Sequence, residues 1–317
     1  QEKVLLKGNF TIDDTLSVYP FTILELDGDV TLADGTNKPM VKNAQETADQ
    51  HILITGGRWH GNAGGQTETD PLNCAGFEIK LSTAYSVKIY ITNVEVTNVR
   101  GHCLLIDHAN YVKVFDSRFE GNIAPYGMQL ATADMFHLNY VGDSQFIRIY
   151  GNSLNANIYT NYCNSNDFSH FYCGGGKYGI YANNGADRDI FTSIRCDMIN
   201  QHGIVHAGFY GFKWCLFDTI MLTRVGKAAN NTWDGIHLDS DSSSPNVNVH
   251  NTFNNVIITN STESNMPRYG IYELSGKADY NIYSTINGYD CGTAALRELG
   301  ANSKHDADSI IGTILTS

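Results

Sequence analysis

The chain has 317 residues, of which 42% are hydrophobic, and its formal net charge at pH 7 is −12. Its 21 basic residues are dispersed and form no basic stripe, which argues against nucleic acid as a partner. No stretch approaches the roughly 20 consecutive apolar residues that span a bilayer, which argues against a membrane protein.

The N-terminal region differs from the rest of the chain. Short strands are predicted over residues 4–12, 16–26 and 30–32, with turns between them. A stack of repeats needs an atypical end repeat to shield its open end. We therefore expect residues 1–48 to form an N-terminal cap and first coil, and residues 49–317 to form the main domain.

A short phrase then recurs, in which a glycine precedes an apolar, a variable and usually a second apolar residue. It begins at Gly76, Gly101, Gly127, Gly179, Gly203, Gly235 and Gly270, with a degenerate copy at Gly292. Self-similarity at intervals of roughly 20 to 50 residues is typical of a repeat architecture.

Each phrase is followed by a second run in which apolar residues alternate, and such alternation predicts a strand. The runs are 87–96, 111–119, 146–150, 190–198, 216–222, 253–258 and 280–286. No helical stretch of comparable strength separates them, which disfavours a fold with crossover helices. The pattern predicts an all-β, single-domain parallel β-helix, a solenoid of short strands.

Residues 294–299 carry the best short helical pattern and are expected to form a terminal turn or cap. Asparagines such as Asn251 and Asn254 are expected to form ladders at the turns between coils. The seven cysteines show neither a CxxC pair nor a metal-ligand spacing. We therefore expect buried free thiols and no metal site. Cys163 and Cys173 are the one pair that could form a disulfide.

Several of these phrases resemble a known superfamily. The stretch from Ile54 to Asn62, the alternating run from Val87 to Val99 and the repeated Gly-Ile-x-Leu are similar to the right-handed parallel β-helix, or pectin-lyase-like, superfamily. The resemblance implies a right-handed coil and a polysaccharide partner. Members of this superfamily include polysaccharide lyases, glycoside hydrolases, epimerases and phage tailspikes, and the fold does not choose among them.

Aligning the repeats on their glycine sorts side chains into columns, because equivalent positions of successive coils stack about 4.8 Å apart. Ile180, Ile204, Ile236 and Ile271 then point inward, and His206 is expected to be a core histidine. Tyr, His and Asp gather in two columns that are expected to face outward, namely Gln129, Tyr181, Val205, His237 and Tyr272, and Tyr126, Tyr178, His202, Asp234 and Tyr269.

The densest acidic cluster runs from Asp234 to Asp241, with Asp239 on the face of His237 and Asp241 in the following turn. Glycoside hydrolysis uses two carboxyl groups, and aromatic rings stack on sugars. We expect Asp234 and Asp239 to act as acid and base, supported by His202 and His237. The expected substrate-binding residues are Tyr178, Tyr181, Trp233, Tyr269, Tyr272, Lys213 and Arg224. A plain solvated sheet face, or a turn or calcium motif at Asp239, would give the same pattern.

The leading hypothesis is therefore an extracellular enzyme that cleaves glycosidic bonds of a polysaccharide without a cofactor. One alternative is a lyase acting on a uronate glycan, which would use a basic residue and a cation such as calcium. The other is a non-enzymatic tailspike or adhesin module that binds glycan on a virion surface. A monomer and a homotrimer are both compatible with the sequence.

Overall fold

The structure is a computed structural model that describes residues 2–47, 51–121, 129–239, 248–260, 264–274, 276–300 and 302–316. The chain divides into two compact units, residues 1–157 and 158–317. The described elements are strands, apart from two 3₁₀ turns, η1 (Ala63–Gly65) and η2 (Ala307–Ser309). Within the described ranges no helix has the length and apolar composition needed to cross a membrane. The predicted all-β class is confirmed.

The first unit is a stack of parallel strands. The long strands pair in the order β1, β3, β5, β7, β9 and β11, and the shorter ones extend the same layers. Their bounds are β1 (Glu2–Ile12), β2 (Leu16–Val18), β3 (Thr22–Leu32), β4 (Val41–Asn43), β5 (His51–Thr55), β6 (Arg58–His60), β7 (Phe77–Thr92), β8 (Glu95–Thr97), β9 (Leu104–Glu120), β10 (Phe136–Asn139) and β11 (Gln145–Asn152). β12 (Ala156–Asn161) lies across the division between the units.

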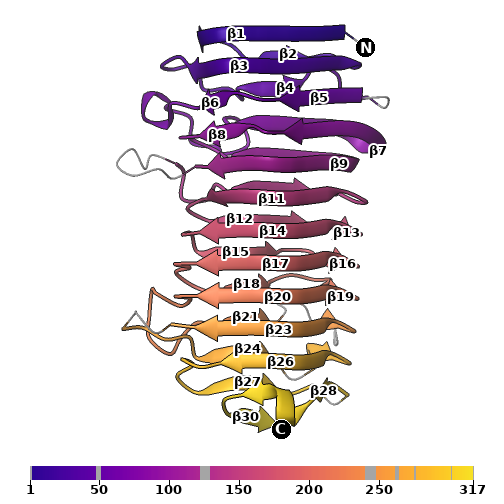
Figure 1. Cartoon of the computed structure of the whole chain (residues 1–317), viewed down its shortest axis with the longest axis vertical. Helices are drawn as coiled ribbons and strands as arrows, with labels where there is room; N and C mark the ends of the chain where they lie inside the picture. Colours follow the sequence, from indigo (N-terminus) through magenta and orange to yellow (C-terminus); the bar gives the residue numbers. More distant parts are fainter. Residues whose placement is uncertain are drawn as a thin grey trace. The chain divides into compact units, whose positions relative to one another are not determined.

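The second unit consists of coils that contribute strands to three parallel layers. Figure 1 shows the longest of these strands stacked in chain order. The first layer holds β14 (Asp167–Gly174), β17 (Ile190–Asp197), β20 (Leu216–Thr223), β23 (Thr252–Thr259), β26 (Ile282–Gly288), β28 (Lys304–His305) and β29 (Ile310–Ile311). The second holds β15 (Tyr178–Ala182), β18 (Ile204–His206), β21 (Ile236–Leu238), β24 (Tyr269–Glu273), β27 (Ala294–Glu298) and β30 (Ile314–Thr316). The third holds β13 (Cys163–Asn164), β16 (Ala186–Asp187), β19 (Phe212–Lys213), β22 (Asn248–Val249) and β25 (Ala278–Asp279).

Each long strand of the second unit bends at one residue with a left-handed backbone. These residues stack in register on successive coils: His170, Ser193, Thr219, Asn255 and Thr285, with φ between 52° and 57°. Strand pairing continues on both sides of the bend. A single left-handed residue therefore turns the strand around the coil without breaking its ladder. Together these features confirm the predicted β-helix.

In the core of the second unit, residues of the same type stack on one another in successive coils. Ile180, Ile204, Ile236 and Ile271 have no exposed surface, which confirms the predicted inward column. Beside them the rings of Phe168, Phe191, Phe217, Phe253 and Tyr283 stack at centroid spacings of 4.9, 4.9, 4.7 and 5.2 Å. These spacings match the strand separation, so coil stacking and ring stacking reinforce one another.

A polar ladder runs along the residues that precede the long strands, as predicted for Asn251. The amide Nδ2 of Asn251 donates to Oδ1 of Asn281 at 3.0 Å, and its own Oδ1 accepts from the Cys215 backbone at 3.0 Å. Asp189 holds the same place two coils earlier and has no exposed surface. Burial raises the pKa of Asp189 to about 8, although hydrogen bonds from Asn166 oppose the shift.

Two expectations are corrected by the structure. Residues 294–298 form the strand β27 rather than a helical turn, because backbone pairing with β24 overrides their helix propensity. Cys163 and Cys173 form no disulfide; all seven cysteines are free thiols and six of them are buried. The expected boundary between a cap and a main domain at residue 48 stays a prediction.

The buried Asp189 makes stability depend on pH. A carboxyl group whose pKa is raised in the folded state contributes stability that is fully present below pH 3.8 and is lost as the pH rises toward 8. We expect Asp189→Asn to increase the free energy of unfolding by roughly 1 to 3 kcal/mol at pH 7.5, and to have little effect at pH 4. Urea denaturation at both pH values measures this. Asn251→Asp is the matched control and should lose stability as the pH rises; parallel pH profiles for wild type and Asp189→Asn would contradict the prediction.

Candidate active site

The candidate site lies on the second layer of the second unit, where side chains from successive coils share one face. Strand pairing aligns Tyr181, Val205, His237, Tyr272 and Arg297 in a single column. The predicted register of Tyr181, Val205, His237 and Tyr272 is therefore confirmed, and the glycine that starts each phrase sets it. The predicted place of Gln129 in this column is wrong: Gln129 lies outside the strands and is buried, where its amide donates to the Gly101 carbonyl and accepts from the Leu154 backbone N–H. The column continues past Tyr272 to Arg297, which the sequence analysis did not include.

A pocket of about 190 Å³ opens beside this column. Polar and aromatic side chains make up most of its wall. The lining residues are Tyr178, Tyr181, His202, Val205, His206, Ala207, Trp233, His237 and Asp239.

Asp234 lies behind the pocket and has no exposed surface. Arg268 binds its carboxylate with two hydrogen bonds, from Nε at 3.1 Å and Nη2 at 2.9 Å, and the Tyr269 backbone N–H donates a third at 3.2 Å. Burial by itself raises the pKa of Asp234, but the hydrogen bonds from His237 and Arg268 outweigh it and hold the pKa below its ordinary value. Asp234 is therefore a fixed, buried carboxylate rather than a group that exchanges protons with a ligand.

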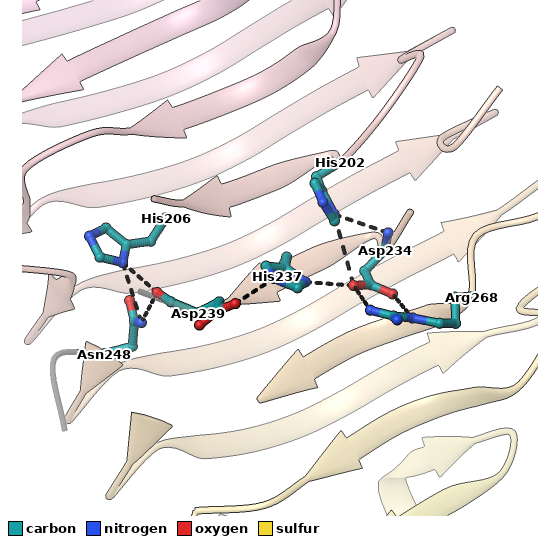
Figure 2. A network of polar contacts seen from close by, with 7 residues as sticks. All are labelled: His202, His206, Asp234, His237, Asp239, Asn248 and Arg268. Carbon is teal, nitrogen blue, oxygen red and sulfur yellow. Dashed lines mark hydrogen bonds and ion pairs between the residues drawn. The ribbon is translucent and has the colours of Figure 1, made fainter. Parts of the chain in front are cut away.

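Figure 2 shows His237 between Asp234 and Asp239, in contact with both carboxylates. Its Nδ1 lies 2.6 Å from Oδ2 of Asp234, and its Nε2 lies 3.5 Å from Oδ2 of Asp239. Burial lowers the pKa of His237, but the bonds to both carboxylates reverse this effect and raise the pKa above 6.5. The imidazole also stacks on Tyr272 with ring centroids 5.0 Å apart.

Asp239 is the carboxylate that the pocket exposes, with a side chain 34% accessible. Its backbone carbonyl accepts hydrogen bonds from Nδ1 of His206 at 2.6 Å and from Nδ2 of Asn248 at 2.8 Å. The other ring nitrogen of His206 accepts the Gly211 N–H at 2.9 Å, which leaves the proton on Nδ1. His206 is a buried, bonded histidine, as predicted, and it positions the backbone of Asp239.

His202 is neutral near pH 7. Burial, followed by the charge of His237, lowers its pKa to about 4. Its Nδ1 accepts the Asp234 backbone N–H at 3.0 Å, so its proton resides on Nε2. Trp233 packs edge-on against this ring, and its buried indole N–H has no hydrogen-bond partner among the described residues.

The structure brings most of the predicted residues together. His202, Asp234, His237, Asp239 and Trp233 form one continuous cluster, and Tyr178 and Tyr181 line its opening. Two tyrosines differ from the expectation of open sugar platforms. Tyr269 and Tyr272 are 6% and 9% exposed, because they stack on each other and lie under the guanidinium groups of Arg268 and Arg297.

Two predicted substrate-binding residues lie elsewhere. Lys213 lines a different hollow beside Tyr162 and Tyr210, and Arg224 makes paired hydrogen bonds to Asp197. Neither belongs to the lining of the candidate pocket. The alternation used to place them does not say which edge of the coil a basic side chain reaches. Two members of the earlier columns and clusters, Tyr126 and Asp241, lie outside the described residues.

Sequence reasoning missed Arg268 and Arg297. Arg268 directly precedes Tyr269, one of the predicted residues, so its position was a usable signal. Its partner Asp234 lies 34 positions earlier, and only the stacking of adjacent coils brings the two together. Arg297 was hidden inside the segment that resembles a helix.

Several groups here offer atoms that metals bind. His202, Asp234 and His237 place one such atom each within 4.8 Å of one another. Arg268 already occupies both carboxylate oxygens of Asp234 with its positive charge. A second cation at this position would be repelled, so we do not assign a metal to it.

The first unit contains a larger hollow. It has a volume of about 550 Å³ and is lined largely by charged residues. Arg58 pairs there with Asp29, and Arg148 pairs with Asp116. The opposite charges pair with one another across adjacent strands, as in a surface ion-pair network. We therefore do not choose this hollow as the candidate site.

Comparison with known proteins supports the fold. No known protein family matches the chain, and no curated protein matches it either. Among solved structures, it resembles the A-module of mannuronan C-5 epimerase AlgE6 from Azotobacter vinelandii, with a TM-score of 0.60 and 15% identity over 99% of this chain and 90% of that one. It also resembles the catalytic domain of a GH87 alpha-1,3-glucanase in complex with nigerose (TM-score 0.66, 10% identity, 99% and 64% coverage) and the Dettilon tailspike protein (0.62, 14%, 99% and 62%). These similarities show a shared parallel β-helix, as the sequence resemblance implied, and the chain spans less than two thirds of the last two proteins.

The contacts of His237 predict its titration. Asp239→Asn removes one of the two carboxylates that stabilise the imidazolium, so the pKa of His237 should fall by about one unit. NMR titration of the histidine side chains measures this. Asp187→Asn, a change in a carboxylate that lines a different hollow, is the control and should leave His237 unchanged. An unaltered pKa in Asp239→Asn would show that the two side chains do not interact in solution.

Proposed function

We propose that the chain is an extracellular enzyme that binds a polysaccharide at this pocket and cleaves its glycosidic bonds. The observation that carries the proposal is the linear arrangement of Arg268, Asp234, His237 and Asp239, which leads from a buried ion pair to an exposed carboxylate. The fold that the chain shares with a glucanase, an epimerase and a tailspike supports a carbohydrate ligand. Fold similarity alone does not choose the reaction.

The pocket has the composition that sugar binding requires. Tyr178 and Tyr181 form a tilted pair with centroids 4.8 Å apart, and Tyr181 stacks on Tyr159 at 5.6 Å. Such rings pack against the apolar faces of sugars. Nε2–H of His202 is a donor at the same wall and can bind a sugar hydroxyl group.

The geometry assigns different roles to the two aspartates. Asp239 is accessible and acts as the acid or base that exchanges a proton with the substrate or with water. Asp234 holds the Nδ1–H tautomer of His237 and thereby directs Nε2 at Asp239. Asp234 is thus a positioning residue, which replaces the sequence-based expectation that it is itself an acid or base.

His237 supports Asp239 in two ways. Its raised pKa keeps the imidazole partly protonated near neutral pH, so Nε2–H donates to the carboxylate and stabilises its negative charge. When Asp239 takes a proton from the attacking water, His237 can donate its own proton to the departing oxygen. The side chain of Tyr272 and the buried ion pair prevent the imidazole from turning away.

Hydrolysis is the first candidate reaction, with Asp239 as its accessible carboxyl group. Elimination on a uronate glycan is the second, because His237 and Asp239 are close enough to act on the same side of a sugar, and Arg268 and Arg297 add positive charge beside them. A bound cation such as calcium would assist elimination, whereas hydrolysis requires no cofactor. The oligomeric alternatives, a monomer and a homotrimer, are both compatible with this site.

The proposal predicts a loss of activity from a single isosteric change. Asp239→Asn keeps the shape of the pocket but cannot exchange a proton, so cleavage should fall at least about 100-fold while glycan binding is retained. Release of reducing ends from a panel of neutral and acidic polysaccharides measures it, with Asp187→Asn as the control. Full activity in Asp239→Asn would exclude this assignment. Tight binding by wild type without any cleavage would instead support a glycan-binding tailspike or adhesin.

The products distinguish the two reactions. Hydrolysis should release reducing ends without new ultraviolet absorbance, and elimination should also create an unsaturated, absorbing uronate. We expect hydrolytic products, unaffected by a calcium chelator. An absorbing product whose formation stops when calcium is removed would favour the lyase.

A further inference from the structure

A second hollow of the second unit lies on the third layer, around β13, β16 and β19. This third-layer hollow has a volume of about 380 Å³, twice the 190 Å³ of the candidate pocket. Such a volume lies in the range typical of small-ligand sites. Aromatic and polar side chains line it, among them Tyr162, Asn164, Asn184, Tyr210 and Lys213. The function proposed above uses none of these residues.

Two glycines create the third-layer hollow. The residues that precede β13, β16 and β19 are Tyr162, Gly185 and Gly211, and strand pairing places them in one column. Gly185 has a φ of 111°, and a Cβ there would lie 2.9 Å from Cβ of Tyr210. L side chains rarely adopt such a backbone, so glycine is required there. The column therefore has a ring on one coil and no side chain on the next two, which leaves space beside the ring.

Tyr162 and Tyr210 border this space without covering each other. Their ring centroids are 5.7 Å apart, their planes are tilted by 56°, and the two residues are 37% and 53% exposed. Elsewhere on the same layer, Trp214, His250 and Tyr280 stack nearly parallel at centroid distances of 4.0 and 5.0 Å. Those rings cover one another's faces, whereas the two tyrosines leave ring surface open to the hollow. The apolar faces of sugars pack against such surfaces.

Lys213 gives the third-layer hollow a positive charge. Its Nζ lies 5.7 Å from the ring centroid of Tyr210, and it makes no ion pair with any described residue. Asp187, its neighbour in the column on one side, already accepts a hydrogen bond from Nη2 of Arg188 at 3.0 Å. Its neighbour on the other side is the neutral Val249. An anionic ligand group beside Lys213 would therefore be attracted, even though the whole chain carries a net charge of −12.

The segment from Ala207 to Gly211 borders both hollows of the second unit. Ala207 lines the candidate pocket, and Gly211 lines the third-layer hollow. Consecutive Cα atoms are 3.8 Å apart, so these two Cα atoms are separated by at most about 15 Å. His206 also joins the two places, because its Nδ1 donates to the Asp239 carbonyl at 2.6 Å and its Nε2 accepts the Gly211 N–H at 2.9 Å. A glycan of a few sugar residues is long enough to occupy both.

We propose that the third-layer hollow is a second glycan subsite, which holds a uronate residue of the same glycan that enters the candidate pocket. The sugar ring packs against Tyr162 and Tyr210, and its carboxylate pairs with Nζ of Lys213. This inference rests on the carbohydrate ligand proposed above, but it does not require that the glycan is cleaved. It gives Lys213 a substrate-binding role outside the candidate pocket.

Binding can be measured on the whole chain carrying Asp239→Asn, which is expected not to cleave. Octamers of galacturonate, mannuronate and glucuronate are the probes for calorimetry, each compared with the same octamer after its carboxyl groups are reduced to alcohols. At least one acidic octamer should bind, and Lys213→Gln should weaken it roughly 10-fold without affecting the reduced form. Tyr210→Ala should weaken both forms, because the ring contact does not depend on charge. Trp214→Ala is the matched control and should leave binding unaltered, because this ring is 59% exposed but does not line the hollow.

Cleavage by the wild type separates this inference from the proposed function. If wild type cleaves, Lys213→Gln should raise KM for the acidic octamer and leave kcat unchanged. If wild type binds the octamer without cleaving it, the proposed function fails and calorimetry still decides the inference. Circular dichroism establishes that each variant is folded. The inference is overturned if no acidic octamer binds more tightly than its reduced form, or if Lys213→Gln and Tyr210→Ala leave the affinity unchanged.

Discussion

In-register parallel pairing of successive coils is the constraint on which the rest of this structure depends. It places residues 18 to 37 positions apart directly over one another, so a side chain within the stack has a neighbour of its own column above and below. Phenylalanine rings, isoleucines and asparagine amides each form continuous stacks for this reason. A residue that suits the column strengthens two interfaces at once. A residue that does not suit its column, such as the buried Asp189, weakens the packing against both neighbouring coils.

The same stacking creates the polar clusters. Asp234 obtains partners from the coil before it, through His202, and from the coil after it, through Arg268. A buried carboxylate is tolerated when its charge is balanced and its lone pairs are bonded, and Arg268 meets both conditions. His237 then links the two carboxylates, because its Nδ1 contacts Asp234 and its Nε2 contacts the accessible Asp239. The equivalent cluster in the first unit, formed by His102, Asp134 and His137, has the same backbone hydrogen bond to its first histidine, but the neutral amide of Asn155 contacts Asp134 where Arg268 contacts Asp234.

Sequence periodicity predicted the coil well and the candidate site in part. The strand runs, the inward isoleucine column and the alignment of Tyr181, His237 and Tyr272 all follow from the glycine that starts each phrase. Exposure was harder to predict, because alternation separates two faces of a strand without saying what covers each face. Tyr272 lies on the expected face and is nevertheless buried under arginines. Lys213, from another edge of the coil, does not reach the pocket.

The sequence by itself determined the repeat, its register and the residues that share a column, because these depend on local alternation and on glycine positions that recur along the chain. Only the tertiary structure decided which charges meet. Arg268 and Asn155 look unremarkable in the sequence, and each acquires its role by lying one coil away from an aspartate. The energy of a buried charge depends on partners from distant segments and on the exclusion of water, and neither is encoded in any short window of residues.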